Sequence, residues 1–386
     1  MRRTVWATMA ALALLGLEER ARVQESPVVT LSIPGRSSAT PWVVADGDFV
    51  AVAWGATTKD EGKTDVFMAV SRDGGARFSA PVQVNAAPGD ARLGGELPPR
   101  VSLRRRGPGR DPEITVLWTA RGPSTSIKLA TSSDGGRTFS SPRVLSKAAA
   151  GDRGWPALTV DNRGAAYAIW LDHRGLAAGQ TDAPHVHDRT RDGFAMAQRS
   201  GLYFASTGSS GARPERELAK GVCYCCKTAL AMSRKGTIYA AWRHVYPGNV
   251  RDIAFTSSAD RGRTFTEPVR VSDDGWEING CPDDGPSLAV DAVGTAHIVW
   301  PTVMAVDGAL EGALFYASTR NGRTFTKRMR IPTRGSPKPS HPQIVVDSHG
   351  RLVVAWDEVI GGHRTVTAQS LHLPGEERTG GPSPDG

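Results

Sequence analysis

The chain has 386 residues, a formal net charge of +8 and 39% hydrophobic residues, a composition that excludes a wholly disordered protein. Its 43 glycines and 26 prolines favour a turn-rich, all-β fold. The positive charge points to an acidic partner, such as a carboxylated glycan or an anionic cell surface. Nucleic acid is not expected, because the Lys and Arg residues are scattered except for a short run at residues 104–106.

The N-terminus has the pattern of an export signal. Two arginines precede an apolar run at residues 5–17, and charged residues follow it. This order is typical of secretory signals, and the run is short for a membrane span. We therefore interpret residues 1–26 as a signal peptide or N-terminal membrane tether, and expect a secreted, periplasmic or cell-envelope protein. Residues 374–386 are expected to be a disordered tail.

One turn sequence occurs four times in the chain. Residues 71–84, 132–145, 256–271 and 318–331 share the frame Ser-x-Asp-x-Gly-x-x-Phe, followed by an alternating apolar strand. In such a turn the Ser and Asp side chains bond to the backbone, the Gly takes positive φ and the Phe packs against the core. We call it the repeated turn. Four copies in register indicate a repeat architecture.

A second repeated unit ends in tryptophan. It reads as a strand, an Asp-x-x-Gly turn and a second strand, with the Trp 14 residues after the first position in four copies. Two further copies, at residues 41–54 and 99–118, differ in length. Six tryptophans share this register and are expected in the core: Trp54, Trp118, Trp170, Trp242, Trp300 and Trp356.

A third strand follows each tryptophan, and in most units the repeated turn and a fourth strand come next. Four antiparallel strands repeated six times predict an all-β fold, a six-bladed β-propeller over residues 27–373. The last unit has no fourth strand of its own. We therefore expect the N-terminal strand at residues 27–33 to close the ring as the outer strand of the sixth blade. We expect a monomer.

The repeated turn resembles the Asp-box, or BNR repeat, of the sialidase-like six-bladed propellers. The resemblance covers nearly all of residues 27–373, although Arg320 stands at the Asp position in blade 5 and blades 3 and 6 lack the turn. It implies the propeller fold and a glycoside hydrolase of the exo-α-sialidase type. The family's first Arg motif is missing from residues 32–34, and the place of its Tyr in blade 6 is taken by Asp357 and Glu358.

Strand alternation predicts two different faces of the disc. The Asp-x-x-Gly turns and the repeated turns lie on one, which we call the turn face. The loops after each tryptophan, and the segments that lead into each first strand, lie on the other, which we call the mouth face. Propellers commonly bind ligands there. Titratable residues concentrate in the mouth-face segments, and the turn face carries nothing comparable.

These mouth-face residues suggest roles by location. Sialidase-like chemistry needs an arginine clamp for a carboxylate, a Tyr activated by a Glu as nucleophile, and an acid/base carboxyl. The sequence offers three clamp arginines, Arg174, Arg243 and Arg251, and one nucleophile pair, Tyr246 with Glu277. The remaining candidates are the carboxyls Asp172, Asp357 and Glu358 and the ligand-binding residues His173, His341, Asp283 and Asp284.

All four cysteines fall in mouth-face segments. Cys223, Cys225 and Cys226 lead into blade 4, and Cys281 leads into blade 5. One alternative is two disulfides that staple the mouth, such as Cys223–Cys226 with Cys225–Cys281. The other is a thiolate site for Zn²⁺ or Cu⁺.

Two functions therefore stay open at the level of sequence. In the first, the mouth face recognises an acidic glycan and hydrolyses it in the manner of a sialidase. In the second, the propeller is not an enzyme and binds a metal ion through the cysteines, or a protein partner.

Overall fold

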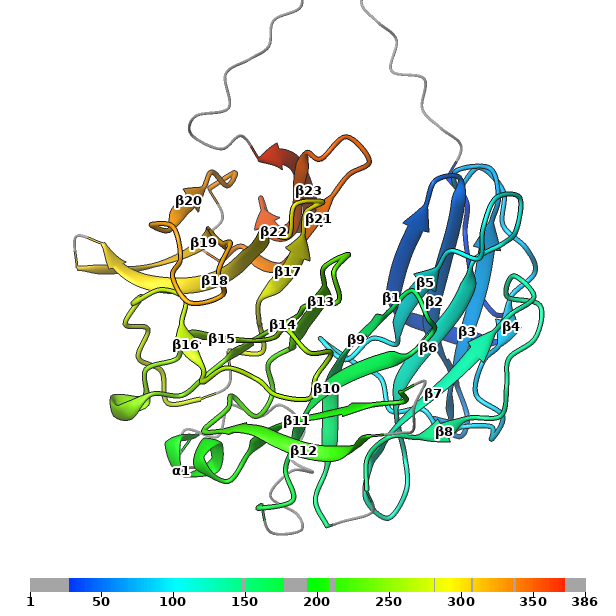
Figure 1. Cartoon of the computed structure of the whole chain (residues 1–386), viewed down its shortest axis with the longest axis horizontal. Helices are drawn as coiled ribbons and strands as arrows, with labels where there is room; N and C mark the ends of the chain where they lie inside the picture. Colours follow the sequence, from blue (N-terminus) through cyan, green and yellow to red (C-terminus); the bar gives the residue numbers. More distant parts are fainter. Residues whose placement is uncertain are drawn as a thin grey trace, which may run out of the picture.

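A computed structural model shows six antiparallel sheets arranged as a β-propeller (Figure 1). It describes residues 28–147, 150–176, 193–208, 213–280, 282–306, 308–335 and 338–371. The expected signal or tether, the expected tail and Cys281 lie outside these residues. Among the helices of the described chain, none is long and apolar enough to span a membrane.

Consecutive strands pair in each sheet, so every blade is a simple meander. Blades 1 to 3 contain β1 (Arg36–Asp46), β2 (Phe49–Thr58), β3 (Thr64–Ser71), β4 (Val82–Gln83), β5 (Arg100–Arg104), β6 (Glu113–Ala120), β7 (Ser126–Ser132), β8 (Arg143–Val144), β9 (Arg153–Val160), β10 (Ala166–Asp172), β11 (Gly201–Ser206) and β12 (Arg213–Lys220). Blades 4 to 6 contain β13 (Ala229–Met232), β14 (Ile238–Arg243), β15 (Ile253–Ser258), β16 (Val269–Arg270), β17 (Ser287–Val290), β18 (Ala296–Val306), β19 (Ala309–Thr319), β20 (Met329–Ile331), β21 (Ser340–Val346), β22 (Leu352–Ile360) and β23 (His363–Leu371). A short helix, α1 (Gly193–Gln198), and a 3-10 turn, η1 (Pro247–Asn249), lie in loops.

The core lies between neighbouring blades. Among the described residues, five apolar clusters join strands of one blade to those of the next, for example Trp118 of β6 with Val66 and Met68 of β3. All six repeated tryptophans are buried on second strands, which confirms their expected place. The first strands contact one another in the order β1, β5, β9, β13, β17, β21, which places them toward the middle of the ring.

The repeated turns form the hydrogen bonds that their sequence predicts. In blade 2, Ser132 Oγ donates to Asp134 Oδ1 at 2.8 Å and accepts the Gly136 N–H at 2.9 Å. Blades 1 and 4 repeat this pattern. In blade 5 the sequence frame placed Arg320 at the Asp position, but Arg320 does not form the hydrogen bonds of the turn. Asn321 takes the Asp position and Thr319 the Ser position, so the turn survives one residue out of the expected frame.

The sixth blade differs from the expectation. Its sheet has three strands, and residues 28–33 form no strand. The expected closing strand was therefore wrong. Leu31 and Ile33 instead pack against Trp54 and Phe67 of blade 1, where their apolar side chains are covered. The outer strand β23 is mostly polar, and exposed residues alternate with half-buried ones along it, a pattern typical of a sheet edge.

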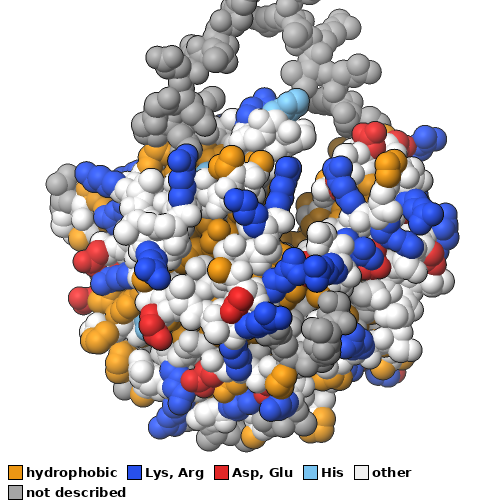
Figure 2. Space-filling model, viewed as in Figure 1, with side chains coloured by type: hydrophobic (Ala, Val, Ile, Leu, Met, Phe, Trp, Pro, Cys, Tyr) orange, Lys and Arg blue, Asp and Glu red, His pale blue; other side chains and the backbone are white. Residues whose placement is uncertain are grey.

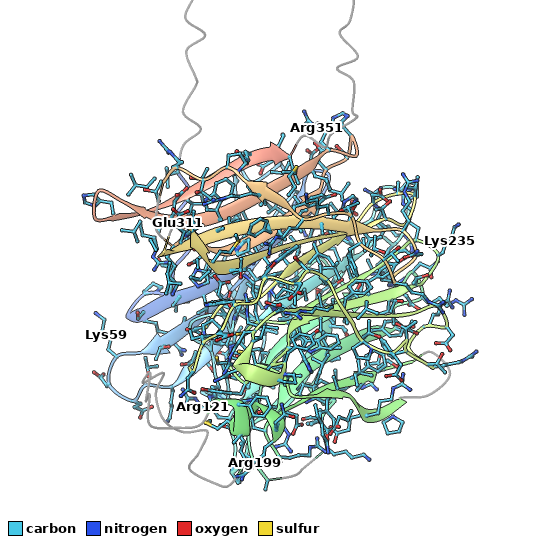
Figure 3. All side chains as sticks on the ribbon, turned by 90° about the vertical axis from the view of Figure 1, so that its left-hand side faces the viewer. Lys59, Arg121, Arg199, Lys235, Glu311 and Arg351 are labelled. Carbon is cyan, nitrogen blue, oxygen red and sulfur yellow. The ribbon has the colours of Figure 1, made fainter. Side chains whose placement is uncertain are left out.

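The two faces of the disc are separated as expected. In the edge-on view of Figure 3, Lys59, in the loop after β2, and Lys235, in the turn between β13 and β14, lie on opposite sides. Lys59 therefore marks the mouth face and Lys235 the turn face. On the surface that Figure 2 shows, Lys and Arg side chains predominate over Asp and Glu, in keeping with the net charge of +8.

Candidate functional site

The segments that lead into the first strands are bent in a shared way. Trp155 and His341 both have positive φ (50° and 54°), and each directly precedes a proline. The pairing register shifts at these places, between Ile169 and Leu171 and between Ser340 and Gln343. A side chain in this backbone region costs about 1–2 kcal/mol, and such residues cluster at functional sites. The bends mark the mouth face as the place to look for a site.

Residues from three blades meet around one buried lysine. The Lys227 ammonium lies 2.9 Å from Glu96 Oε1 and 3.7 Å from Asp284 Oδ1. It also donates to the Pro342 carbonyl at 3.2 Å, while the Lys227 N–H donates to Glu96 Oε2 at the same distance. Glu96, Lys227 and Asp284 are each at most 6% exposed. Blades 2, 4 and 5 therefore share one charged centre.

A half-exposed histidine connects this centre to blade 6. The His341 N–H donates to Asp284 Oδ2 at 2.9 Å, and His341 Nδ1 lies 2.6 Å from Asp357 Oδ1. Arg364 pairs with the other oxygen of Asp357. We call Glu96, Lys227, Asp284, His341 and Asp357 the central cluster. It brings together three residues predicted from the sequence with two that were not.

The central cluster holds protons near neutral pH. Burial raises the pKa of Glu96 to about 7, and the Asp284 charge adds to this, while the Lys227 charge opposes it. The hydrogen bond with Asp357 raises the pKa of His341 above its usual value. Burial works against ionisation of Asp357, but its bonds to His341 and Arg364 lower its pKa. The cluster thus combines a carboxyl able to carry a proton with a carboxylate that stays charged.

Sequence reasoning did not find Glu96 and set Lys227 aside as a solvated residue. A signal for both was present, because each lies in a segment that leads into a first strand, as do Asp283 and Asp284. Asp283 itself has positive φ (49°) and lies beside Gly95, next to Glu96. Aligning these segments across all six blades would have placed Glu96 at the mouth.

Two of the three expected clamp arginines are fully engaged inside the protein. Arg243 is 1% exposed and donates to the carbonyls of Asp284, Arg251 and Pro301. Arg251 is 0% exposed and donates to the Ile278 carbonyl, Asn249 and the Cys223 sulfur. These bonds tie the lead-in segment of blade 5 to blade 4 and hold both guanidinium groups inside the protein.

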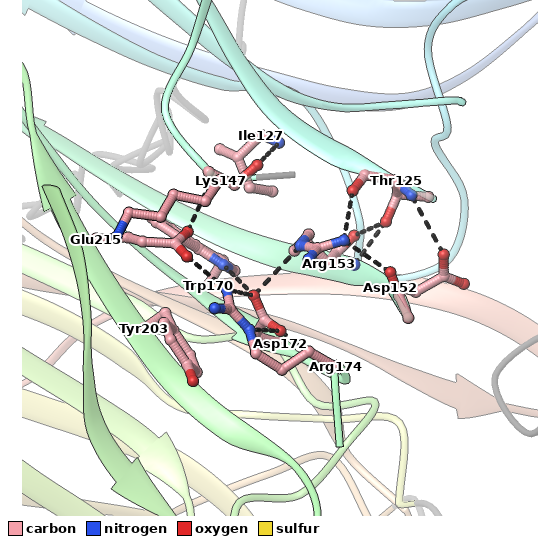
Figure 4. A network of polar contacts seen from close by, with 12 residues as sticks. Thr125, Ile127, Lys147, Asp152, Arg153, Trp170, Asp172, Arg174, Tyr203 and Glu215 are labelled. Atoms are coloured by element: carbon pink, nitrogen blue, oxygen red, sulfur yellow. Dashed lines mark hydrogen bonds and ion pairs between the residues drawn. The ribbon is translucent and has the colours of Figure 1, made fainter. Parts of the chain in front are cut away.

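The third arginine belongs to a separate ion-pair network. Arg174 forms two bonds with Asp172 and one of 2.7 Å with Glu215, and its guanidinium lies over the Tyr203 ring (Figure 4). Arg153 reaches the same Asp172 from the other side, at 3.3 Å. Burial opposes ionisation of Asp172, but these two guanidinium groups lower its pKa. Asp172 is therefore a fixed anion that joins β9 to β10.

The expected nucleophile pair is not assembled. Tyr246 and Glu277 are both described, and no hydrogen bond joins them. Burial raises the pKa of Tyr246 to about 12, and its ring contacts His244 and the Arg270 guanidinium. A phenol in this environment stays protonated at neutral pH.

Two further candidates are buried inside the mouth rather than lining it. His173 is 3% exposed, and burial lowers its pKa to about 4, so the ring is neutral. It lies against Trp155, with ring centres 5.9 Å apart. Glu358 is 1% exposed and accepts bonds from the Trp356 indole and the Arg334 N–H. Both side chains have contacts that support the loops around them.

Three cysteines meet in the lead-in segment of blade 4. Cys223 Sγ lies 2.6 Å from Cys226 Sγ and 3.8 Å from Cys225 Sγ, and all three residues are buried. Cys223 and Cys226 carry free thiols, whereas Cys225 is not free. Burial opposes ionisation of Cys223, but the Cys226 thiol and the charges of Arg251 and Arg243 lower its pKa to about 6. Burial and the Cys223 charge raise the pKa of Cys226.

Comparison with solved structures places this architecture among known propellers. The chain superposes on an α-L-arabinofuranosidase from Fusarium graminearum with a TM-score of 0.54 and 13% identity, covering 87% of this chain and 93% of that one. An intramolecular trans-sialidase from Ruminococcus gnavus gives 0.51 and 10%, over 87% and 94%. An α-L-arabinanase from Penicillium chrysogenum gives 0.50 and 16%, over 90% and 96%.

The chain has the sialidase-like six-bladed propeller fold. No protein-family model matches the sequence, and no curated protein is detectably similar to it. At these identities the likeness concerns the fold alone, which hosts more than one chemistry. The activity of this propeller has to be argued from its own site.

Proposed function

We propose that this sialidase-like propeller is a glycoside hydrolase whose mouth face binds a glycan and whose central cluster cleaves the glycosidic bond. The observation that carries the proposal is Glu96, a buried carboxyl whose pKa is raised to about 7, beside a second carboxylate, Asp284. The solved relatives act on sugars, as their descriptions as arabinofuranosidase, arabinanase and trans-sialidase state.

The chemistry follows from two carboxyl groups, Glu96 and Asp284, that lie beside one ammonium. Most glycosidases pair a protonated acid, which donates to the leaving oxygen, with a carboxylate that stabilises or attacks the developing cation. Glu96 suits the acid, because at neutral pH it retains a proton much of the time. Asp284, within 3.7 Å of the same ammonium, suits the anionic role. His341 and Asp357, at the more exposed edge, are suited to orient the sugar hydroxyls.

The geometry favours a different sugar from the one expected. The expected acidic glycan depended on Arg174, Arg243 and Arg251, whose donors bond to groups of the protein. A carboxylated sugar gains little from arginines whose bonds are already made to the protein. We therefore propose a neutral substrate, with a pentose glycan such as an arabinan as the first to test.

The test is hydrolysis of a panel of 4-nitrophenyl glycosides, with a fluorogenic sialoside added. We expect cleavage of an α-L-arabinofuranoside, loss of cleavage by at least a hundredfold in Glu96→Gln, and wild-type cleavage in Glu113→Gln. Glu113 is a matched control, because it pairs with Arg104 beside the turn-face residue Gly164. No cleavage of any glycoside by the wild-type protein, or equal cleavage by Glu96→Gln, would contradict the proposal.

A second candidate function is supported by the cysteines. The sulfur atoms of Cys223, Cys225 and Cys226 lie within 4.8 Å of one another, a grouping that fits a soft cation such as Zn²⁺ or Cu⁺. Two thiolates on one tetrahedral Zn²⁺ are about 3.8 Å apart. Cys225 is disulfide-bonded, so a site with three thiolates needs this bond to be reduced first. The two free thiols, Cys223 and Cys226, lie 2.6 Å apart. Metal analysis with thiol titration distinguishes the two states: bound metal supports the metal site, and no metal with no thiols supports disulfides.

A further inference from the structure

A cavity of about 290 Å³ opens on the turn face, away from the central cluster. It lies between blades 3 and 4, where the Asp-x-x-Gly turn before β10 meets the repeated turn after β15. Sequence analysis placed all candidate site residues on the mouth face. The lining of this cavity shows that titratable residues also gather at one place on the turn face.

The lining of this cavity is positively charged. Four of its residues are cationic and two are carboxylates, which leaves a formal charge of +2: Arg163, Lys235, Arg261, Arg263, Asp161 and Asp260. The carboxylates are already engaged. Asp161 accepts the N–H groups of Arg163 and Ala165 and the Tyr167 hydroxyl, and Asp260 accepts bonds within its own turn. Among the described residues, none of the four cationic groups has an ion-pair partner. The cavity therefore offers unpaired positive charge.

A buried hydroxyl without a partner also lines the cavity. Ser206 is 1% exposed, and its Oγ makes no hydrogen bond. It ends β11, the third strand of blade 3, as Ser132 and Ser258 end the third strands of blades 2 and 4. Those two serines bond to the Asp of the repeated turn. The sequence after Ser206 has no Asp before Asp252, so its hydroxyl is left for another acceptor.

An arginine at the cavity occupies a position that favours glycine. Arg261 has a φ of 58°, whereas the corresponding residues of blades 1 and 2 are Gly74 and Gly135, with φ of 69° and 72°. A non-glycine residue in this region costs about 1 kcal/mol or more. The chain thus carries strain at the repeated turn of blade 4, which lines this cavity. Strain of this kind is most often found at functional positions.

We propose that the turn-face cavity is a binding site for a phosphate monoester borne on a small sugar. The +2 lining matches a dianionic phosphate, and arginines with a hydroxyl donor are the groups that bind its oxygens best. The cavity volume exceeds that of a free phosphate ion and lies near the lower end of the volumes of ligand pockets. The cavity therefore has room for a monosaccharide. This inference does not rest on the proposed hydrolysis at the mouth.

The test is calorimetric titration of the full chain with glucose 6-phosphate, glucose 6-sulfate, glucuronate, inorganic phosphate and glucose. We expect glucose 6-phosphate to bind most tightly, inorganic phosphate and the sulfate more weakly, and glucose not at all. Arg261→Gly and Arg263→Gln should each weaken the phosphate ester about tenfold or more, because each removes a charge-assisted hydrogen bond. Ser206→Ala should weaken it by a smaller factor.

Two controls keep folding apart from binding. Arg261→Gly relieves strain, so its melting temperature should equal or exceed that of the wild type while binding is lost. Arg323→Gln alters the arginine that corresponds to Arg263 in blade 5 and should bind normally. Hydrolysis at the mouth should be unchanged in all of these variants. No binding of glucose 6-phosphate, or equal binding by wild type and Arg261→Gly, would overturn the proposal.

Discussion

The two faces of this propeller use charged residues in opposite ways. At the mouth face, buried charges from blades 2, 4 and 5 pair around Lys227, and His341 and Asp357 of blade 6 pair beside them, so the charge is largely balanced within the protein. At the turn-face cavity, four cationic side chains have no carboxylate partner within the described part of the chain, and the nearby carboxylates hold backbone groups. A paired cluster favours proton chemistry at fixed positions, whereas unpaired charge around a cavity favours binding of a counter-ion.

The largest effect is expected when the Lys227 charge, which Glu96 and Asp284 share, is removed from the mouth face. Lys227→Met leaves Glu96 and Asp284 buried together without a cation, and we expect a loss of about 3–5 kcal/mol in the free energy of unfolding. Denaturant unfolding measures it. Lys235→Met, on the turn face, should change this free energy by about 0.5 kcal/mol at most. Equal effects of the two substitutions would show that the faces do not differ as described.

The ion-pair network of blade 3 should show a smaller loss. Asp172→Asn keeps the shape of the side chain but removes the charge that Arg153 and Arg174 share. We expect a loss of about 2–3 kcal/mol, because Arg174 retains Glu215 and partial access to water. Thermal and denaturant unfolding of the variant test this. An unchanged unfolding curve would mean that the network does not support the mouth face.

The protonated carboxyl predicts a pH dependence of stability. Glu96 has a higher pKa in the folded than in the unfolded state, so the folded protein binds this proton more tightly. Its contribution is fully present below pH 4.5 and is lost as the pH rises from about 4.5 to 7, with a slope of at most about 1.4 kcal/mol per pH unit. The difference between wild type and Glu96→Gln isolates it. A difference that is flat over this range would contradict the assignment.

The smallest effect is expected at the rim of the mouth. Arg364 is largely exposed and pairs with Asp357, so Arg364→Gln should change the free energy of unfolding by about 1 kcal/mol or less. The change should shrink further in high salt. A loss comparable to that of Lys227→Met would mean that the rim, and not the buried centre, holds the cluster together.

Much of the fold could be predicted from the sequence because it is a local pattern repeated. The turn hydrogen bonds of Ser132 with Asp134, and the burial of Trp118, depend on residues close together in the chain. The way in which the ring closes could not be predicted from a local pattern. The apolar residues 28–33 fit either a strand or a cover for blade 1, and only tertiary packing separates the two.

The site was predicted less well because its contacts join different blades. The sequence located Asp284, His341 and Asp357 on the correct face but could not show that Glu96, which is 131 residues from Lys227, completes the cluster. Nor could it show which arginines would be engaged by carbonyl groups, as Arg243 is. At the turn face, the missing Asp after Ser206 was visible, but the cavity that accompanies it was not.

The most direct test of this account is the titration of Glu96 itself. Carbon-13 NMR of the side-chain carboxyl carbons, with Glu96→Gln to assign the resonance, reports its protonation in the intact protein. We expect the Glu96 signal to titrate near pH 7, above the ordinary pKa of a glutamate, because burial beside Asp284 holds the proton. A Glu96 that titrates near pH 4.5 would be ionised at neutral pH and could not serve as the acid of the mouth face.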